Sequence, residues 1–150
     1  MFRDGAERLL VFQVGAERFA VALAAVDEAI DAPPLRPLPD AGRTVLGIAT
    51  IRGALVPIYD PRPLLNVEGR VDDAALLFVR GDARAGLAVS GVHDAILVNE
   101  TELRPAPGTD ASDRVMIGVV RRGAELIAIL DAGALLDAAM SATGAQGERT

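Results

Sequence analysis

Residues 45–60, VLGIATIRGALVPIYD, are the most informative segment of the sequence. Its two apolar runs, rich in β-branched residues, flank the polar segment TIRG at residues 50–53, a pattern typical of two strands joined by a tight turn. Gly53 supplies the free backbone angles that such a turn requires. Arg52 is the only charged residue between Arg43 and Asp60. Its guanidinium either covers the mouth of a barrel or presents five fixed donors to a partner, and the spacing favours neither alternative.

The composition limits the possible functions. The 150 residues, 51% of them hydrophobic, suffice for one domain or for two small lobes that share a core. There is no cysteine and only one histidine, so disulfides and thiolate metal sites are excluded, and we expect no metal and no cofactor. The net charge of −6 and the absence of tryptophan argue against a nucleic-acid partner, which requires a basic surface and stacking side chains.

The sequence also bears on localisation. No apolar window reaches the length of a membrane span. The first residues, MFRDGAER, lack the basic start, apolar stretch and cleavage site of a signal peptide. We therefore expect a cytoplasmic protein without direct membrane insertion.

The second half of the chain repeats the first. Residues 10–30 align without a gap on residues 76–96, and residues 56–65 align on 127–136. Between these blocks, residues 46–47 match 117–118, the triplet Arg-Gly-Ala at 52–54 matches the one at 122–124, and the proline-rich segment 37–39 matches 105–107. Matches that recur in the same order, at offsets of 66 to 71 residues, indicate two pseudo-equivalent lobes.

Short strands separated by glycine and proline turns are typical of small barrels, which remove exposed sheet edges. We therefore predict an all-β domain over residues 8–137, with two lobes of about five strands each, roughly 8–66 and 75–137. Whether the lobes exchange strands is left open. A short helix is expected over residues 131–140, with flexible tails at 1–7 and 141–150.

Catalytic and structural alternatives compete at several positions. Ser90, His93 and Asp94 could form a nucleophilic site, although their spacing does not require one, and a surface histidine is the simpler interpretation. Asp60 ends a strand before a leucine-rich turn, a position where aspartate commonly caps backbone amides. Val26 belongs either to the core or to an apolar docking ridge beside the charged Glu28.

Taken together, these residues resemble the CheW-like coupling proteins of bacterial chemotaxis over nearly the whole chain, from about Leu9 to Leu136. The strongest part is the pattern VLGI…IRG…VPIYD within residues 45–60, which is similar to the glycine, arginine-glycine and proline-aspartate signature of that family. The segment VDEAI at 26–30 and the proline pair in LRPAP at 103–107 are similar to further family motifs. Ser90 departs from the family, which usually has aspartate there.

The resemblance implies two intertwined five-stranded barrels of SH3 type and a non-enzymatic adaptor. Such an adaptor links the cytoplasmic tip of methyl-accepting chemoreceptors to the regulatory domain of a CheA-type histidine kinase. The alternative is a diverged module of another motility or developmental pathway that binds a receptor or regulator but not the kinase. The expected partner-binding residues are Arg52, Glu28, Val26, Thr50, Gly53, Val56 and Ile58. The expected structural motif consists of Gly47, Gly53, Pro57 and Asp60.

Overall fold

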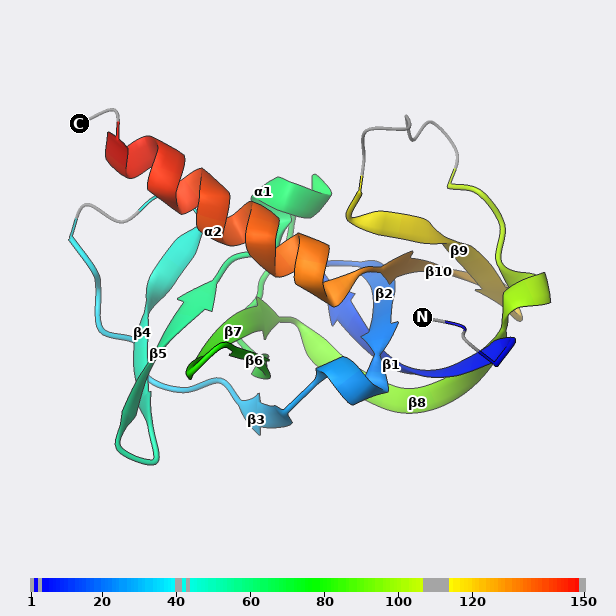
Figure 1. Ribbon diagram of the computed structural model, residues 1–150, viewed down its shortest axis with the longest axis horizontal. Coiled ribbons are helices and arrows are strands. Elements are labelled where there is room, and N and C mark those ends of the chain that lie inside the picture. The colour runs from blue at the N-terminus through cyan, green and yellow to red at the C-terminus, as the bar shows by residue number, and fades with distance from the viewer. Residues whose placement is uncertain (1, 3, 40–41, 43, 107–113, 149–150) are drawn as a thin grey trace.

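The computed structural model describes residues 2, 4–39, 42, 44–106 and 114–148, with residues 142–148 described by their backbone alone. Strands dominate, and two 3₁₀ turns and two α-helices connect or follow them (Figure 1). The elements are β1 (Ala6–Val14), β2 (Glu17–Ala22), η1 (Leu23–Ala25), β3 (Glu28–Asp31), β4 (Val45–Ile51), β5 (Ala54–Tyr59), α1 (Arg62–Leu65), β6 (Ala74–Arg80), β7 (Ala83–Val89), β8 (Gly91–Asn99), η2 (Glu100–Glu102), β9 (Met116–Arg122), β10 (Glu125–Leu130) and α2 (Ala132–Glu148).

The strands form two five-stranded sheets that lie side by side (Figure 1). Sheet A has the order β8-β1-β2-β10-β9 and sheet B the order β3-β6-β7-β5-β4. Neighbours are antiparallel except for the pairs β2–β10 and β5–β7, which are parallel. The all-β class and the number of strands are as predicted. The expected barrels are not closed, because the hydrogen-bonded order of each sheet has two ends.

The internal repeat explains this topology. If β1–β5 correspond to β6–β10, each sheet contains two strands of one copy and three of the other. The pairing registers agree with the equivalence, since Ile58 lies opposite Gly86 and its counterpart Ile129 lies opposite Ala20. The copies have therefore exchanged strands reciprocally.

One part of the sequence alignment is wrong by one residue. Ile51 pairs with Ala54 across the β4–β5 turn, and Arg122 pairs with Glu125 across the β9–β10 turn. Arg122 is therefore the structural counterpart of Ile51 and not of Arg52. The two turns contain the same triplet, but strand pairing sets the register and the triplet does not.

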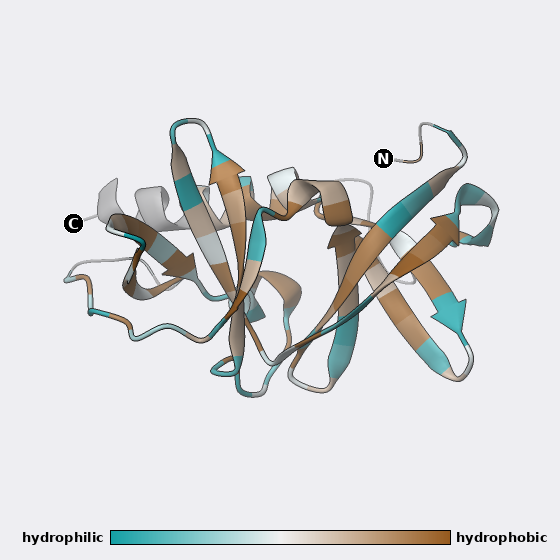
Figure 2. Cartoon of the chain, turned by 90° about the horizontal axis from the view of Figure 1, so that it is seen from below, coloured by the Kyte–Doolittle hydropathy of each residue, from teal (hydrophilic) through white to brown (hydrophobic). Residues whose placement is uncertain are grey.

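Alternating residues of β1 contribute to two different cores. Leu9 and Val11 belong to a small cluster within sheet A, whereas Phe12 and Val14 belong to a larger cluster that extends into sheet B and α2. The alternation follows from the strand period of two. Figure 2 shows the apolar residues along the strands and many polar residues at the turns.

The structure also describes residues on both sides of the expected domain, 8–137. Helix α2 continues to Glu148 and so extends past residue 140, where a flexible tail is expected. At the other end Phe2 is 9% exposed and packs in the small core of sheet A. Among the described residues, the structure contains no helix that is long and apolar enough to cross a membrane.

Candidate functional site

The β4–β5 turn places Arg52 at one end of sheet B (Figure 1). Arg52 and Gly53 both have positive φ, at 49° and 82°, as in the two-residue type I′ turn that suits the twist of a hairpin. Glycine adopts this backbone conformation without strain, whereas an L-residue such as arginine does so at a cost. Arg52 therefore occupies a position where local geometry favours other residue types.

Arg52 belongs to a surface charge cluster of four residues, Asp27, Glu28, Arg52 and Arg84. The Arg52 guanidinium donates to the Glu28 carboxylate. The Arg84 Nη1 atom lies 3.4 Å from Glu28 Oε1 and 3.1 Å from Asp27 Oδ2. The cluster thus joins the β4–β5 turn, the start of β3 and the start of β7.

The electrostatics of the cluster keep its central pair ionised. The hydrogen bond from Arg52 lowers the pKa of Glu28 below its ordinary value of 4.5, and the charges of Arg52 and Arg84 act in the same direction. The same hydrogen bond raises the pKa of Arg52. The Arg52 side chain is nevertheless 63% exposed, and solvent screens the attraction within an ion pair so open to water, which therefore adds little to the stability of the fold.

The other expected partner-binding residues fall into two groups. Thr50 and Gly53 are exposed on the same hairpin as Arg52, and Val26 is half-buried just before the cluster. Val56 and Ile58 are each only 1% exposed, so the expectation that they bind a partner is corrected. Successive side chains of a strand point to opposite faces, and Val56 and Ile58 lie on the face of β5 that packs into the core.

Sequence reasoning missed three residues at this end of the molecule. Arg84 and Asp27 complete the charge cluster, although no short-range pattern links β7 to β3. Leu55 is 67% exposed beside the turn. The alternation of β5 could have revealed Leu55, since it precedes the buried Val56 by one position.

The expected structural motif lies behind the turn. A Cβ atom on Gly47 would lie 2.8 Å from the Arg36 carbonyl oxygen, because Arg36 and Ile48 form an isolated antiparallel bridge. Pro57 of β5 lies opposite Ile48 of β4. The next two residues of β5, Ile58 and Tyr59, pair with β7.

Asp60 is 6% exposed and organises the segment that follows β5. Its carboxylate accepts hydrogen bonds from the Arg62 backbone amide at 3.0 Å and from Arg62 Nε at 2.9 Å. Its own amide donates to the Thr44 carbonyl at 2.7 Å. Asp60 therefore holds the start of α1 against the strand that precedes it.

The residues of the catalytic alternative make other contacts. The Ser90 hydroxyl donates to the Arg70 carbonyl and accepts from the Gly15 amide at 2.7 Å. The His93 Nε2 atom lies 3.1 Å from Gln13 Oε1. Ser90 thus connects backbone segments, which gives this departure from the expected aspartate a role inside the fold.

Comparisons with known proteins agree with the architecture and the motif. A family model for the CheW-like domain matches residues 8–140. Similar proteins include a chemotaxis protein CheW of Rhizobium meliloti, 30% identical with 69% of each chain covered, and one of Bacillus subtilis, 28% identical with 87% of each covered. The scaffolding protein TtCheW from Thermoanaerobacter tengcongensis has the same fold, with a TM-score of 0.72 at 21% identity over 83% of this chain and 88% of that one. The chain therefore belongs to the CheW-like family.

Proposed function

We propose that the protein is a non-enzymatic adaptor that couples methyl-accepting chemoreceptors to a CheA-type histidine kinase. The observation that carries the proposal is the match of the CheW-like family model over residues 8–140. By binding the receptor and the kinase, the adaptor would be recruited to receptor arrays at the membrane.

The charge cluster around Arg52 supports a binding role for this end of sheet B. The Arg52 guanidinium is mostly exposed although it is ion-paired. The left-handed backbone conformation of Arg52 is strained for arginine but would not be strained for glycine. Arg52 therefore adds little to folding, which supports a role for it in recognition. We propose that Arg52, Glu28, Thr50, Gly53 and Val26 contribute to the partner-binding surface.

The alternative is a diverged module that binds a receptor or regulator but no kinase. Ser90, which stands where the family usually has aspartate, is the sequence feature that favours this alternative, yet its hydroxyl joins Arg70 and Gly15 within the fold. The presence of serine in place of aspartate at position 90 therefore does not by itself remove a binding surface. The coupling role is the better supported of the two.

The test is a pull-down of the purified protein against the regulatory domain of each CheA-type kinase from the same organism. We expect one kinase to bind, and Arg52→Ala to weaken that binding by about 2 kcal/mol, or roughly 30-fold, as is typical of arginine at an interface centre. Arg70→Ala is the matched control, because Arg70 is also ion-paired and its side chain is 86% exposed. Binding to no kinase by a cooperatively folded protein would favour the diverged module.

A further inference from the structure

The Glu28 carboxylate is held through both of its oxygen atoms. Its Oε2 atom accepts a hydrogen bond from Arg52 Nη2, and its Oε1 atom lies 3.4 Å from Arg84 Nη1, within ion-pair distance. Two cations on different oxygens restrict the plane of a carboxylate as well as its position. The direction in which Glu28 receives Arg52 therefore depends on Arg84.

Arg84 is the more firmly placed of the two arginines. Its side chain is 20% exposed, against 63% for that of Arg52. Arg84 lies in β7, the middle strand of sheet B, opposite Val79 of β6. Arg52 lies in the turn that follows β4, an edge strand of the same sheet. The arginine of the central strand thus holds the acid that receives the arginine of the exposed turn.

A second contact joins Arg84 to the start of β3. The Arg84 Nη1 atom lies 3.1 Å from Asp27 Oδ2, and Asp27 directly precedes Glu28, the first residue of β3. This strand forms the other edge of sheet B and has only four residues. Arg84 therefore fixes both acids at the point where a short edge strand begins.

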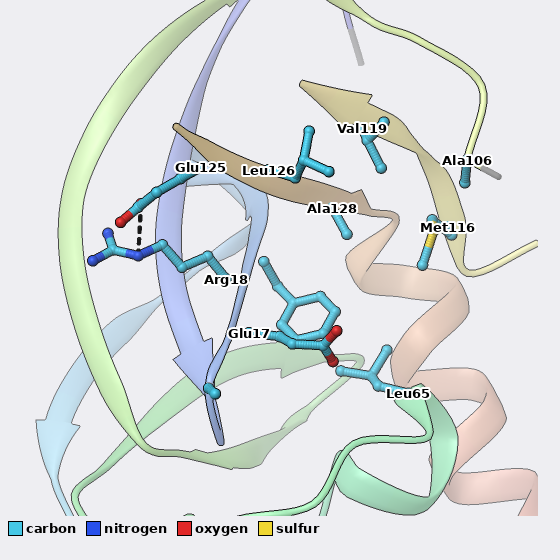
Figure 3. A pocket seen from close by; sticks show the side chains of 11 residues that line it. Glu17, Arg18, Leu65, Ala106, Met116, Val119, Glu125, Leu126 and Ala128 are labelled. Carbon is cyan, nitrogen blue, oxygen red and sulfur yellow. Dashed lines mark ion pairs between the residues drawn. The ribbon is translucent and has the colours of Figure 1, made fainter. Parts of the chain in front are cut away.

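The internal repeat offers a comparison within the same molecule. In the alignment of the two copies, Arg18 is the counterpart of Arg84 and Asp94 is that of Glu28, and the strand pairing gives the same correspondence. Arg18 forms its ion pair with Glu125 of β10, at 2.8 Å (Figure 3). The equivalent arginine of sheet A thus contacts an acid on a different strand.

This difference between the copies follows the residue at the turn. Because Arg122 is the counterpart of Ile51, the counterpart of Arg52 is Gly123. Gly123 has a φ of 63°, which glycine adopts without strain, and it has no side chain to pair with an acid. The contact between Arg84 and Glu28 therefore occurs in the copy whose turn carries an arginine.

We propose that Arg84 is a positioning residue for the partner-binding surface. It holds the Glu28 carboxylate in the orientation that receives Arg52, and so directs the Arg52 guanidinium toward the partner. The inference rests on the proposed function, because it gives Arg84 a part in the recognition assigned to Arg52. Arg84 itself needs no contact with the partner.

The first measurement uses the free protein. NMR of the arginine side chains follows rotation about the Nε–Cζ bond of Arg52, whose signal is the one missing from Arg52→Ala. A guanidinium held by a carboxylate rotates more slowly than a free one. We expect Arg84→Gln to speed this rotation about threefold, the low end of the coupling between contacting residues. Arg84→Lys, which keeps the charge, should restore part of the restriction.

Arg18→Gln is the matched control for both measurements. Arg18 occupies the register position of Arg84 in the other sheet, and its side chain is ion-paired and 32% exposed. Arg18→Gln should therefore leave the rotation of Arg52 and the binding of the partner unchanged.

The second measurement is a double-mutant cycle on binding to the CheA-type kinase that the pull-down selects. Arg84→Gln should weaken binding about fivefold when Arg52 is present, and less than about twofold in a chain that carries Arg52→Ala, as expected of two residues that act through one network. Arg84→Lys should give an intermediate loss. If thermal melts show that Arg84→Gln is not folded at the temperature of the binding assay, Arg84→Lys takes its place in the cycle.

Three results would overturn the proposal. The first is an Arg52 rotation that Arg84→Gln leaves unchanged. The second is an equal loss of affinity with and without Arg52, which would place Arg84 in direct contact with the partner. The third is the same loss from Arg18→Gln, which would show a general effect of removing an ion pair. If the wild-type protein binds no kinase, the proposed function fails, whereas the rotation measured in the free protein still decides whether Arg84 positions Arg52.

Discussion

Arg52 illustrates how a single residue can be placed against its local preference. Its φ of 49° lies in the left-handed region, which costs an L-residue about 1–2 kcal/mol relative to glycine. Its ion pair with Glu28 is open to solvent, so the attraction between the two charges is screened and contributes little to stability. The arginine is therefore not explained by its contribution to folding.

We predict that Arg52→Gly keeps the free energy of unfolding within about 1 kcal/mol of wild type, because relief of backbone strain offsets the lost ion pair and the greater freedom of the unfolded chain. Urea denaturation monitored by circular dichroism measures the change. A loss of more than about 2 kcal/mol would show that Arg52 is a structural residue and would contradict its assignment to a binding surface.

A second residue-scale prediction concerns Glu28. Its pKa is lowered chiefly by the hydrogen bond from Arg52, so Arg52→Ala should raise it toward the ordinary value. Because the folded-state pKa is the lower one, the pair contributes stability above the ordinary value of 4.5 and loses it as the pH falls through the lowered pKa. NMR titration of the glutamate carboxyl carbons measures this shift. The pKa of Glu102, lowered mainly by the Asn99 amide, is the internal control and should not change.

At the scale of secondary-structure elements, two glycines allow equivalent bridges to form. Gly47 and Gly118 are counterparts, and a Cβ atom would lie 2.8 Å from the Arg36 carbonyl oxygen at the first and 2.6 Å from the Arg104 carbonyl oxygen at the second. Each glycine adjoins a register shift in its strand pair. The close approach of two backbone segments explains why glycine occupies both positions.

We predict that Gly47→Ala and Gly118→Ala each destabilise the fold by about 1–3 kcal/mol, the usual cost of forcing extra atoms into a packed site. Gly53→Ala should cost about 1–2 kcal/mol for a different reason, since its φ of 82° is strained for alanine although nothing lies near its Cβ position. Thermal or urea melts measure all three. Gly91→Ala is the control, because it meets no neighbour within 4 Å, and a Gly47→Ala melt indistinguishable from it would refute the steric explanation.

At the scale of the whole molecule, the reciprocal exchange of strands makes the two sheets interdependent. Sheet A needs β8–β10 from the second copy and sheet B needs β3–β5 from the first. The larger hydrophobic core extends across both sheets and α2. A boundary between residues 66 and 75 therefore separates two repeats in the sequence but not two folding units.

We predict that residues 1–70 and 71–150 are each unfolded when expressed alone, because each lacks strands of both sheets. Mixed or co-expressed, they should recover the β-sheet signal of the intact protein. Circular dichroism and amide NMR spectra of the separate and combined fragments test this. A dispersed NMR spectrum from either fragment alone would show that a half folds independently and that the exchange is not required.

The candidate site was only partly accessible to sequence reasoning. Arg52 and Glu28 stand out through motif resemblance, and the structure brings them into contact. Arg84 joins them through strand pairing that no local pattern encodes. Val56 and Ile58 belong to the same motif yet are buried, because a motif records which residues occur together and not which face of the strand each occupies.

The amino-acid sequence alone predicts the all-β class, the internal repeat and the motif of the family, because these depend on local patterns of apolar, turn-forming and charged residues. Strand pairing, the counterpart of Arg52 and the burial of Val56 and Ile58 follow instead from the folded molecule. These features depend on contacts between segments far apart in the chain. The stabilising energy of these contacts comes from the shared hydrophobic core, which forms only when both copies of the repeat fold together.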